Sequence, residues 1–310
     1  MSRITVFGAS GFIGRQLILE ADRDMISPVT HSPQKPASVE GGKGNWLVAD
    51  LLKSSSIDKI LIPQSTVINL AYSETSSSED NIKMAINLLH ACCRAKVSKL
   101  VHCSTAVVVG GNPSPTVRED TRCLPVTPYE KTKYHIESLL LEKENDDIKI
   151  CILRPTAVIG PRGENLKKML LAIKEGNSFI NYIRSSVFGN RRLNLVPVQD
   201  VARALIHLCK LSSLHSGIYI CSADDDPDNR YDKVEKIMRD LLEKQKIMEP
   251  IRLPEYILRM MLRYYRSGAG RFANRNYSSE KLIRTGFKRS QTIAQAVQEF
   301  ILSEAESPVR

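Results

Sequence analysis

The sequence lacks the cysteine spacing of a disulfide framework, because its seven cysteines stand singly or as the pair Cys92-Cys93 and form no CxxC motif. Scattered thiols of this kind are typical of reduced cytosolic proteins. The six histidines also lack ligand spacing, so we expect no metal site. There is no run of the roughly 20 apolar residues that cross a bilayer, and no cleavable signal at the N-terminus. The sequence therefore predicts a cytoplasmic protein without a transmembrane segment.

Acidic residues are too few to balance the basic ones, and the formal net charge is +10. Much of the excess lies between residues 252 and 289. A basic surface concentrates anionic ligands such as dinucleotides, sugar nucleotides or acidic lipid, although it can also be a merely solvated face. Residues 254–266 are expected to form a helix with an apolar side and an arginine side. This helix would pack on the core or, as the alternatives, touch a membrane surface or form a lid over an anionic substrate.

Short apolar runs alternate with helical patterns through the first half of the chain. The runs predicted as strands are Ile4–Phe7, Ile26–Thr30, Trp46–Ala49, Thr66–Ala71, Leu100–Cys103 and Ile148–Leu153. Nearly continuous apolar strands between helices are typical of a doubly wound parallel sheet, the α/β Rossmann class. After Pro161 the pattern loosens, and we expect helices near 166–174, 200–211, 232–246 and 292–303 and a strand over 217–221.

A glycine-rich turn, Gly8-Ala9-Ser10-Gly11-Phe12-Ile13-Gly14, follows the first predicted strand and opens a helix. The glycines permit a tight turn, a close backbone approach to a pyrophosphate and close packing of helix on strand. The helix N-terminus adds free N–H groups and a partial positive charge. In this position the turn predicts a dinucleotide site.

The acid that usually binds the adenosine ribose should follow the second strand, but His31, Ser32 and Lys35 stand there without a carboxylate. Its absence removes a repulsion against a 2′-phosphate, which these three residues could contact. The cofactor is therefore expected to be NAD or NADP, with a preference for NADP. Asp50, after the third strand, is interpreted as an adenine contact or as a turn residue.

Tyr129 and Lys133 are four residues apart and share one face of a helix that Pro128 opens. An ordinary tyrosine pKa near 10 is too high for a base at neutral pH, and a neighbouring ammonium lowers it. Ser104 and Thr105 follow the neighbouring strand, where a hydroxyl can orient a substrate oxygen. The three groups together indicate proton transfer coupled to redox chemistry.

With these motifs the chain resembles the extended short-chain dehydrogenase/reductase family of nucleotide-sugar epimerases and dehydratases. The resemblance covers almost the whole length. Beyond the segments above, it includes Ala49-Asp50-Leu51, Val67-Ile68-Asn69-Leu70-Ala71, Ser104-Thr105 to Val109-Gly110, Arg154-Pro155-Thr156-Ala157-Val158-Ile159-Gly160-Pro161 and Val196-Pro197-Val198-Gln199-Asp200.

The resemblance implies a role for each matching residue. Tyr129 would be the general acid/base, Lys133 would hold the nicotinamide ribose and lower the tyrosine pKa, and Thr105 would take the serine/threonine position. Along the cofactor it implies Asp50, Leu51, Leu70, Ala71 and, at the nicotinamide end, Pro155. On the substrate side it implies Tyr72, Ser104, Arg191, Arg192 and Asn194. Residues 1–162, with a returning segment near 190–221, would form the NAD(P)-binding domain, and 163–310 the substrate lobe.

Departures from the family pattern narrow the reaction. Ala106 and Val107 replace the acid pair of dehydratases, so sugar dehydration is disfavoured. Ala157 replaces an asparagine that is common in epimerases. Leu193 replaces an arginine that binds the diphosphate of the substrate, and the neighbouring Arg191 and Arg192 could take over this role. These changes leave a sugar-nucleotide 4-epimerase or 4-ketoreductase.

Two other functions stay open. An NADP-dependent reductase of an apolar ketone, like the hydroxysteroid and dihydroflavonol reductases, fits Ala157 and the missing ribose acid. A catalytically silent sensor is disfavoured by the complete set of Thr105, Tyr129 and Lys133. We expect a homodimer formed through helices 82–93 and 129–141, no nucleic-acid partner, and a role in polysaccharide biosynthesis.

Overall fold

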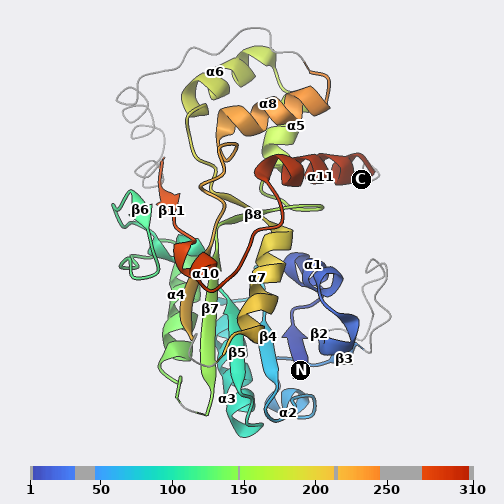
Figure 1. Cartoon of the computed structure of the whole chain (residues 1–310), viewed down its shortest axis with the longest axis vertical. Coiled ribbons are helices and arrows are strands. Elements are labelled where there is room, and N and C mark those ends of the chain that lie inside the picture. Colours follow the sequence, from blue (N-terminus) through green and yellow to red (C-terminus); the bar gives the residue numbers. More distant parts are fainter. Residues whose placement is uncertain (1–2, 32–45, 146, 213–215, 245–273, 307–310) are drawn as a thin grey trace.

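A seven-stranded parallel sheet forms the centre of the computed structural model, which describes residues 3–31, 46–145, 147–212, 216–244 and 274–306 (Figure 1). The strand order is β10-β7-β5-β4-β1-β2-β3. The strands are β1 (Ile4–Phe7), β2 (Ile26–Thr30), β3 (Leu47–Val48), β4 (Thr66–Asn69), β5 (Lys99–Cys103), β7 (Lys149–Pro155) and β10 (Gly217–Cys221). The order reverses at β1, so the predicted doubly wound sheet is confirmed.

Helices cover both faces of this sheet. One face carries α1 (Phe12–Glu20), α7 (Val198–Lys210) and the short α10 (Glu280–Arg284). The other carries α2 (Ser54–Asp58), α3 (Ser78–Arg94) and α4 (Pro128–Leu141). Because both faces are covered, the strands have apolar residues on both sides, which explains their nearly continuous apolar runs.

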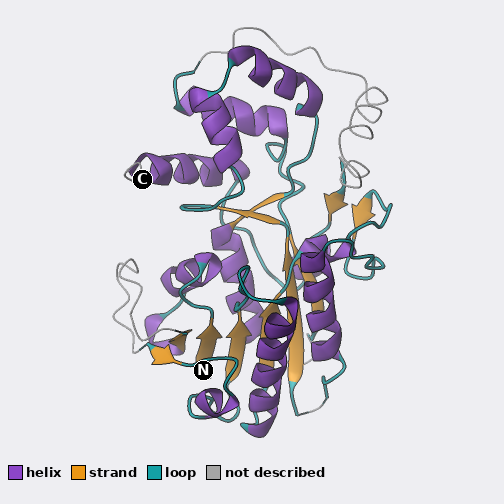
Figure 2. Cartoon of the chain, turned by 180° about the vertical axis from the view of Figure 1, so that it is seen from behind, coloured by secondary structure: helices purple, strands orange, loops and turns teal. Residues whose placement is uncertain are grey.

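A separate apolar core lies beyond the C-terminal ends of the strands, where the strand arrows point in Figure 2. Its helices are α5 (Lys167–Glu175), α8 (Tyr231–Leu241) and α11 (Ile293–Glu306), and α6 (Ser178–Phe188) packs on α8. The predicted helices near 166–174, 200–211 and 292–303 are thereby confirmed. The helix expected over 232–246 ends instead at Leu241, because Glu243 adopts a left-handed conformation with φ of 53° that a helix cannot continue.

Two small parallel sheets join distant parts of the chain. β8 (Ala157–Ile159) pairs with β9 (Leu195–Pro197), and β6 (Thr116–Val117) pairs with β11 (Asn276–Tyr277). Two 3₁₀ turns, η1 (Arg23–Met25) and η2 (Ala106–Val109), complete the described elements. Among the described residues no helix is long and apolar enough to span a bilayer. The arginine-rich stretch 254–266 lies outside the described residues.

Candidate active site

The glycine turn between β1 and α1 is packed as tightly as a dinucleotide cradle requires. A Cβ on Gly14 would lie 2.4 Å from the carbonyl oxygen of Gly8, and one on Gly8, where φ is +77°, would lie 2.8 Å from the nitrogen of Ala71. Gly11 precedes the helix and offers no side-chain cap, so Phe12, Ile13 and the following N–H groups stay open to an anion. The carbonyl of Ser10 accepts a hydrogen bond from Arg15 Nε at 2.9 Å. These residues fit a pyrophosphate at the helix N-terminus.

A carboxylate, that of Asp50, follows β3 at the same edge of the sheet. Oδ1 of Asp50 accepts from the backbone nitrogen of Leu52 at 2.9 Å, which is a local turn contact. The same carboxylate lies 3.8 Å from His31 Nδ1 and 3.8 Å from Lys53 Nζ. Of the predicted adenosine contacts, the structure describes Asp50 and the exposed His31, whereas Ser32 lies outside the described residues.

The C-terminal end of β4 connects the glycine turn to the rest of the site. Leu70 and Ala71 follow this strand, and their backbone atoms are those that a Cβ on Gly8 would meet. Asn69 Oδ1 accepts from the nitrogen of Ala71 at 3.0 Å, and this bond holds the turn. The predicted cofactor-lining residues Leu70 and Ala71 thus lie directly beside the predicted phosphate turn.

The N-terminal cap of helix α4 places Tyr129 in the first turn of the helix. Thr127 is its N-cap and forms a capping box with Glu130, while Pro128 occupies the first helical position. This start satisfies the free N–H groups of the helix and fixes its direction. Lys133 lies one turn further along the same face, so the predicted pair is brought together with the end of β5.

Tyr129, Thr105 and Tyr72 meet at this point. The side chain of Thr105, the N-cap of η2, acts on the Tyr129 phenol and lowers its pKa, and the Tyr72 ring packs edge-on against the Tyr129 ring with 5.3 Å between centroids. Although 39% of Tyr129 is exposed, burial raises the pKa of its phenol to about 12, against the lowering effect of Thr105. The phenol is therefore protonated at neutral pH.

Lys133 is buried and has two neighbours in the site. Its Nζ donates to the carbonyl of Cys103 at 3.3 Å and lies 4.4 Å from the centroid of the Tyr72 ring. Burial lowers the pKa of this ammonium, while the charge of Glu137 and the thiol of Cys103 raise it. Lys133 is not among the groups that shift the pKa of Tyr129, so the expected lowering of the tyrosine pKa stays a prediction.

A buried ion pair fixes α4 to the sheet below these groups. Arg154 Nη2 donates to Glu137 Oε2 at 2.5 Å and Arg154 Nε to Glu137 Oε1 at 3.0 Å. These side chains are 3% and 1% exposed. Glu137 lies one turn beyond Lys133, and Pro155 ends the strand that carries Arg154. The pair thus connects the helix of Tyr129 to the strand of Pro155.

The predicted substrate residues separate into two groups. Arg192 lines an open hollow of about 560 Å³ together with Asn190, Arg230 and Asn274. Arg191 instead lies with its guanidinium 5.9 Å from the ring of Phe188 on α6. Ser104 is buried near the end of β5, and its Oγ has no partner within the described part of the chain. The structure therefore brings Arg192, but not Arg191, to this hollow.

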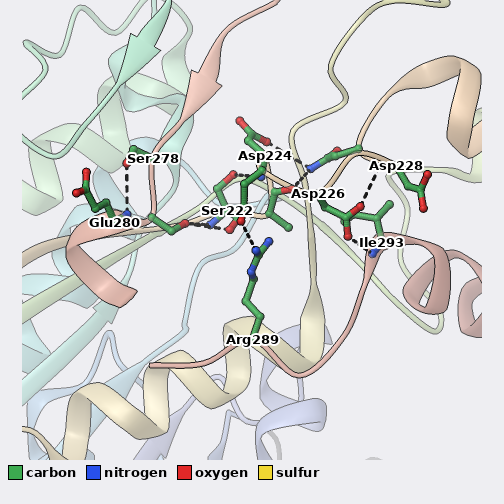
Figure 3. Close-up of polar contacts among 12 residues, drawn as sticks. Ser222, Asp224, Asp226, Asp228, Ser278, Glu280, Arg289 and Ile293 are labelled. Atoms are coloured by element: carbon green, nitrogen blue, oxygen red, sulfur yellow. Dashed lines mark hydrogen bonds and ion pairs between the residues drawn. The ribbon is translucent and has the colours of Figure 1, made fainter. Parts of the chain in front are cut away.

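Asp224, after β10, organises the wall of the hollow. Its carbonyl accepts from Arg192 Nη1 at 2.6 Å, and its Oδ2 accepts from Asn194 Nδ2 at 2.6 Å and from the nitrogen of Tyr277 at 2.6 Å. Burial raises the pKa of its carboxyl, and these hydrogen bonds oppose the shift. Figure 3 shows the polar contacts of this segment: the nitrogen of Asp224 donates to Ser222 Oγ at 3.1 Å, and the carboxylate of Asp226 accepts from the nitrogens of Asp228 and Ile293.

The contacts of several residues in the site could not be predicted from the sequence alone. Asn69 lies inside a recognisable motif, but its bonds to Ala71 and His102 depend on the pairing of β4 with β5. Arg230 and Asp224 belong to a polar loop, and polar loops are common on any surface. Arg275 donates to the carbonyl of Gly110, which closes η2, at 3.3 Å and so ties β11 to the Thr105 segment.

Comparisons with known proteins agree with this geometry. Residues 4–221 match the model of a family described as "NAD dependent epimerase/dehydratase family". A UDP-glucose 4-epimerase of Azospirillum brasilense is 30% identical over 156 residues, which are 44% of this chain and 43% of the relative. A 3beta-hydroxysteroid-dehydrogenase/decarboxylase (isoform 2) of Arabidopsis thaliana is 25% identical over 239 residues, 68% of this chain and 41% of the relative.

Solved structures extend the likeness of the fold to nearly the whole chain. A UDP-N-acetylglucosamine 4-epimerase from Methanobrevibacter ruminantium M1, solved with UDP-N-acetylmuramic acid, superposes with a TM-score of 0.73 at 20% identity. The superposition covers 98% of each chain. By contrast, the chain spans about half the length of the first curated relatives it matches.

Proposed function

The chain belongs to the NAD dependent epimerase/dehydratase family, and on this premise we propose that it binds a nicotinamide dinucleotide and acts on a nucleoside diphosphate sugar as a 4-epimerase or 4-ketoreductase. One observation carries the proposal. Contacts run without a break from Gly8, through Leu70–Tyr72, to Tyr129 and Lys133. A dinucleotide with its pyrophosphate on the glycine turn would therefore end with its nicotinamide ring beside the phenol.

The chain's own residues would move a proton and orient the substrate. Tyr129, which its raised pKa keeps protonated at neutral pH, would give its proton to the substrate oxygen during reduction and take a proton during oxidation. Thr105, whose side chain acts on the Tyr129 phenol, would hold the same oxygen in line. Lys133 would bind the ribose and favour the phenolate during oxidation. When bound, the cofactor supplies hydride transfer.

The hollow beside Asp224 is the proposed place for the diphosphate. Arg192 and Arg230 line it with Asn190 and Asn274, and guanidinium groups suit phosphate oxygens. The fold is compatible with a substrate lobe over residues 163–310, since this part has its own apolar core. Ala106, which begins η2, cannot transfer a proton, so the proposal excludes sugar dehydration.

We propose NADP as the preferred cofactor because no carboxylate follows β2 at His31. Asp50 lies close by, but its carboxylate is engaged by the turn at Leu52 and faces Lys53. Titration with NADP and NAD, followed by calorimetry, tests this choice. Equal or tighter binding of NAD contradicts it.

Thermal-shift measurements with UDP, dTDP, GDP and CDP sugars test the substrate class. We expect one nucleotide series to stabilise the protein and Arg192→Met to abolish the shift. Arg94→Met, whose side chain pairs with Asp58 away from the site, serves as the matched control. Absence of stabilisation by every nucleotide sugar, at concentrations well above typical Kd values, overturns the proposal.

Mass spectrometry of cofactor retained after gentle purification distinguishes the two sugar reactions. An epimerase returns its own hydride, so retained NAD supports epimerisation. Recovery of NADP or of an empty protein supports the ketoreductase.

A second candidate function is reduction of an apolar ketone. Val107, Leu124 and Val126 are exposed around η2 and the start of α4, so the surroundings of Tyr129 offer apolar surface. The similarity to a 3beta-hydroxysteroid-dehydrogenase/decarboxylase points the same way. Turnover of a steroid ketone with NADPH, together with no response to nucleotide sugars, would favour this function.

A further inference from the structure

Asn69 and His102 form a buried polar pair behind the catalytic candidates. They face each other in register on β4 and β5 and are 2% and 1% exposed. Asn69 Oδ1 accepts from the nitrogen of Ala71 at 3.0 Å, and Asn69 Nδ2 lies 3.2 Å from His102 Nδ1. The pair therefore connects the cofactor-lining turn to the strand that leads to Thr105.

These two bonds determine where the proton of the imidazole sits. A backbone N–H only donates, so the Asn69 amide must turn its oxygen to Ala71 and its NH₂ group to His102. An NH₂ group also only donates, so Nδ1 of His102 must be the acceptor. The neutral ring then carries its hydrogen on Nε2. Burial and the charge of Lys133 both lower the pKa of His102 well below its ordinary value, which agrees with a neutral ring.

The His102 imidazole lies close to a positive charge, the ammonium of Lys133. The charge of Lys133 reaches the ring, and its Nζ donates to the carbonyl of Cys103, the next residue along β5. Neither His102 Nε2 nor Ser104 Oγ has a hydrogen-bond partner among the residues that the structure describes. Other titratable or charged groups around Lys133 are Glu137 with its partner Arg154, the Cys103 thiol, and the phenols of Tyr72 and Tyr129.

We propose that Asn69 is a positioning residue that fixes His102 as a neutral Nε2–H donor behind Lys133, so that no second cation faces the nicotinamide end of the site. Protonation of His102 would set Nδ1–H against the NH₂ group of Asn69. Rotation of the amide would then leave the N–H of Ala71 without its acceptor. The tautomer follows from the contacts alone, whereas its effect on the cofactor rests on the proposed function. Oxidised nicotinamide is cationic and reduced nicotinamide is neutral, so a second cation would weaken binding of the oxidised form.

Nitrogen NMR of protein labelled with ¹⁵N-histidine tests the tautomer directly. We expect His102 to show a bare Nδ1 and a protonated Nε2 from about pH 5.5 to 8, the range in which ordinary histidines titrate. His102→Phe identifies its signals among those of the six histidines. A protonated Nδ1, in either the other tautomer or the imidazolium, overturns the proposal.

Asn69→Asp tests the consequence for the cofactor. The carboxylate can accept from both Ala71 and a protonated His102, so the variant should hold an imidazolium at low pH. We expect its ratio of Kd for oxidised to reduced cofactor to rise on the order of tenfold between about pH 8 and 5.5, as one added charge roughly 10 Å away would cause. The ratio should stay flat in the wild type and in the double variant Asn69→Asp/His102→Phe.

Asn145→Asp is the matched control, since Asn145 Oδ1 likewise accepts from the nitrogen two residues on, that of Asp147, at 2.8 Å in the exposed loop before β7. Its ratio should follow the wild type. A flat ratio in Asn69→Asp, with the imidazolium visible by NMR, overturns the charge effect. If the wild type binds neither cofactor form, the proposed function fails, and the NMR experiment still decides the tautomer.

Discussion

The phenol of Tyr129 shows how its surroundings set the chemistry of one side chain. Burial raises its pKa to about 12, compared with an ordinary value near 10. A raised pKa keeps the phenol protonated through neutral pH, and phenolate forms only as the pH rises toward 12. We therefore expect Tyr129→Phe to leave the phenolate absorbance of the cofactor-free protein unchanged at pH 10. Loss of about half a tyrosine's signal there would indicate an ordinary pKa.

The same substitution should separate binding from catalysis. Tyr129→Phe removes the proton donor, and we expect kcat to fall by about 10²- to 10⁴-fold while nucleotide-sugar thermal shifts persist. Tyr134→Phe is the control, because Tyr134 is an exposed tyrosine on the same helix. Initial rates measure both variants, followed by the absorbance of reduced cofactor for a ketoreductase and by chromatography of the sugar nucleotides for an epimerase. Equal activity of the two variants would remove Tyr129 from the mechanism.

Two glycines of the phosphate turn should respond differently to alanine. At Gly14 a Cβ would lie 2.4 Å from the carbonyl oxygen of Gly8, whereas at Gly11 the nearest atom would be 3.3 Å away. We expect Gly14→Ala to destabilise the fold by about 1–3 kcal/mol, because α1 must move off β1. Gly11→Ala should fold nearly normally but bind cofactor more weakly. Urea denaturation and cofactor titration check the two effects, and equal loss of stability would contradict this division.

The position of helix α4 depends on its buried ion pair as well as on its cap. Removing one partner leaves an uncompensated charge, so Arg154→Met or Glu137→Leu should each lower the free energy of unfolding by about 3–5 kcal/mol. The double variant should lose less than the sum of the two. The exposed pair Arg284–Glu280 on α10 is the control, where the loss should be about 0.3–0.5 kcal/mol. Additive losses in urea denaturation would show that the buried pair is not coupled.

Strands and helices that bury a regular apolar pattern could be predicted from the sequence, and long-range contacts could not. β1, β2 and β10 fall at the predicted residues because apolar runs mark strands that are covered on both faces. α6 was not predicted, since its short mixed pattern follows the loosening of the periodicity after Pro161.

The residues of the site likewise include some that the sequence predicts and others that only the fold reveals. The sequence motifs identified Thr105, Tyr129 and Lys133, and the fold brings these three together. The partner of Asn69 is 33 residues away and that of Arg275 is 165 residues away, and their register is set only by tertiary packing. Local propensity contains no information about such pairs.

At the scale of the whole molecule, Asp224 joins distant parts of the chain, because donors from residues 192–194 and from Tyr277 meet at it. Asn194 and the nitrogen of Tyr277 both donate to its buried carboxylate. Asp224→Ala would leave these donors without their acceptor, at a cost of about 1–3 kcal/mol for each buried group. We expect hydrogen exchange to accelerate at residues 276–277 and around Asn194, and nucleotide-sugar affinity to fall.

Loss of the Asp224 contacts should affect only the region around them. β1, β4 and β5 have their own cores, so their exchange rates should stay at the wild-type level in Asp224→Ala. The control is Asp225→Ala, because the neighbouring carboxylate of Asp225 is exposed and pairs with Arg289. Faster exchange across the whole sheet in Asp224→Ala would mean that the sheet and the substrate side unfold as one cooperative unit. Exchange confined to the strands around the hollow would instead show that Asp224 orders the substrate side on a sheet that is stable without it.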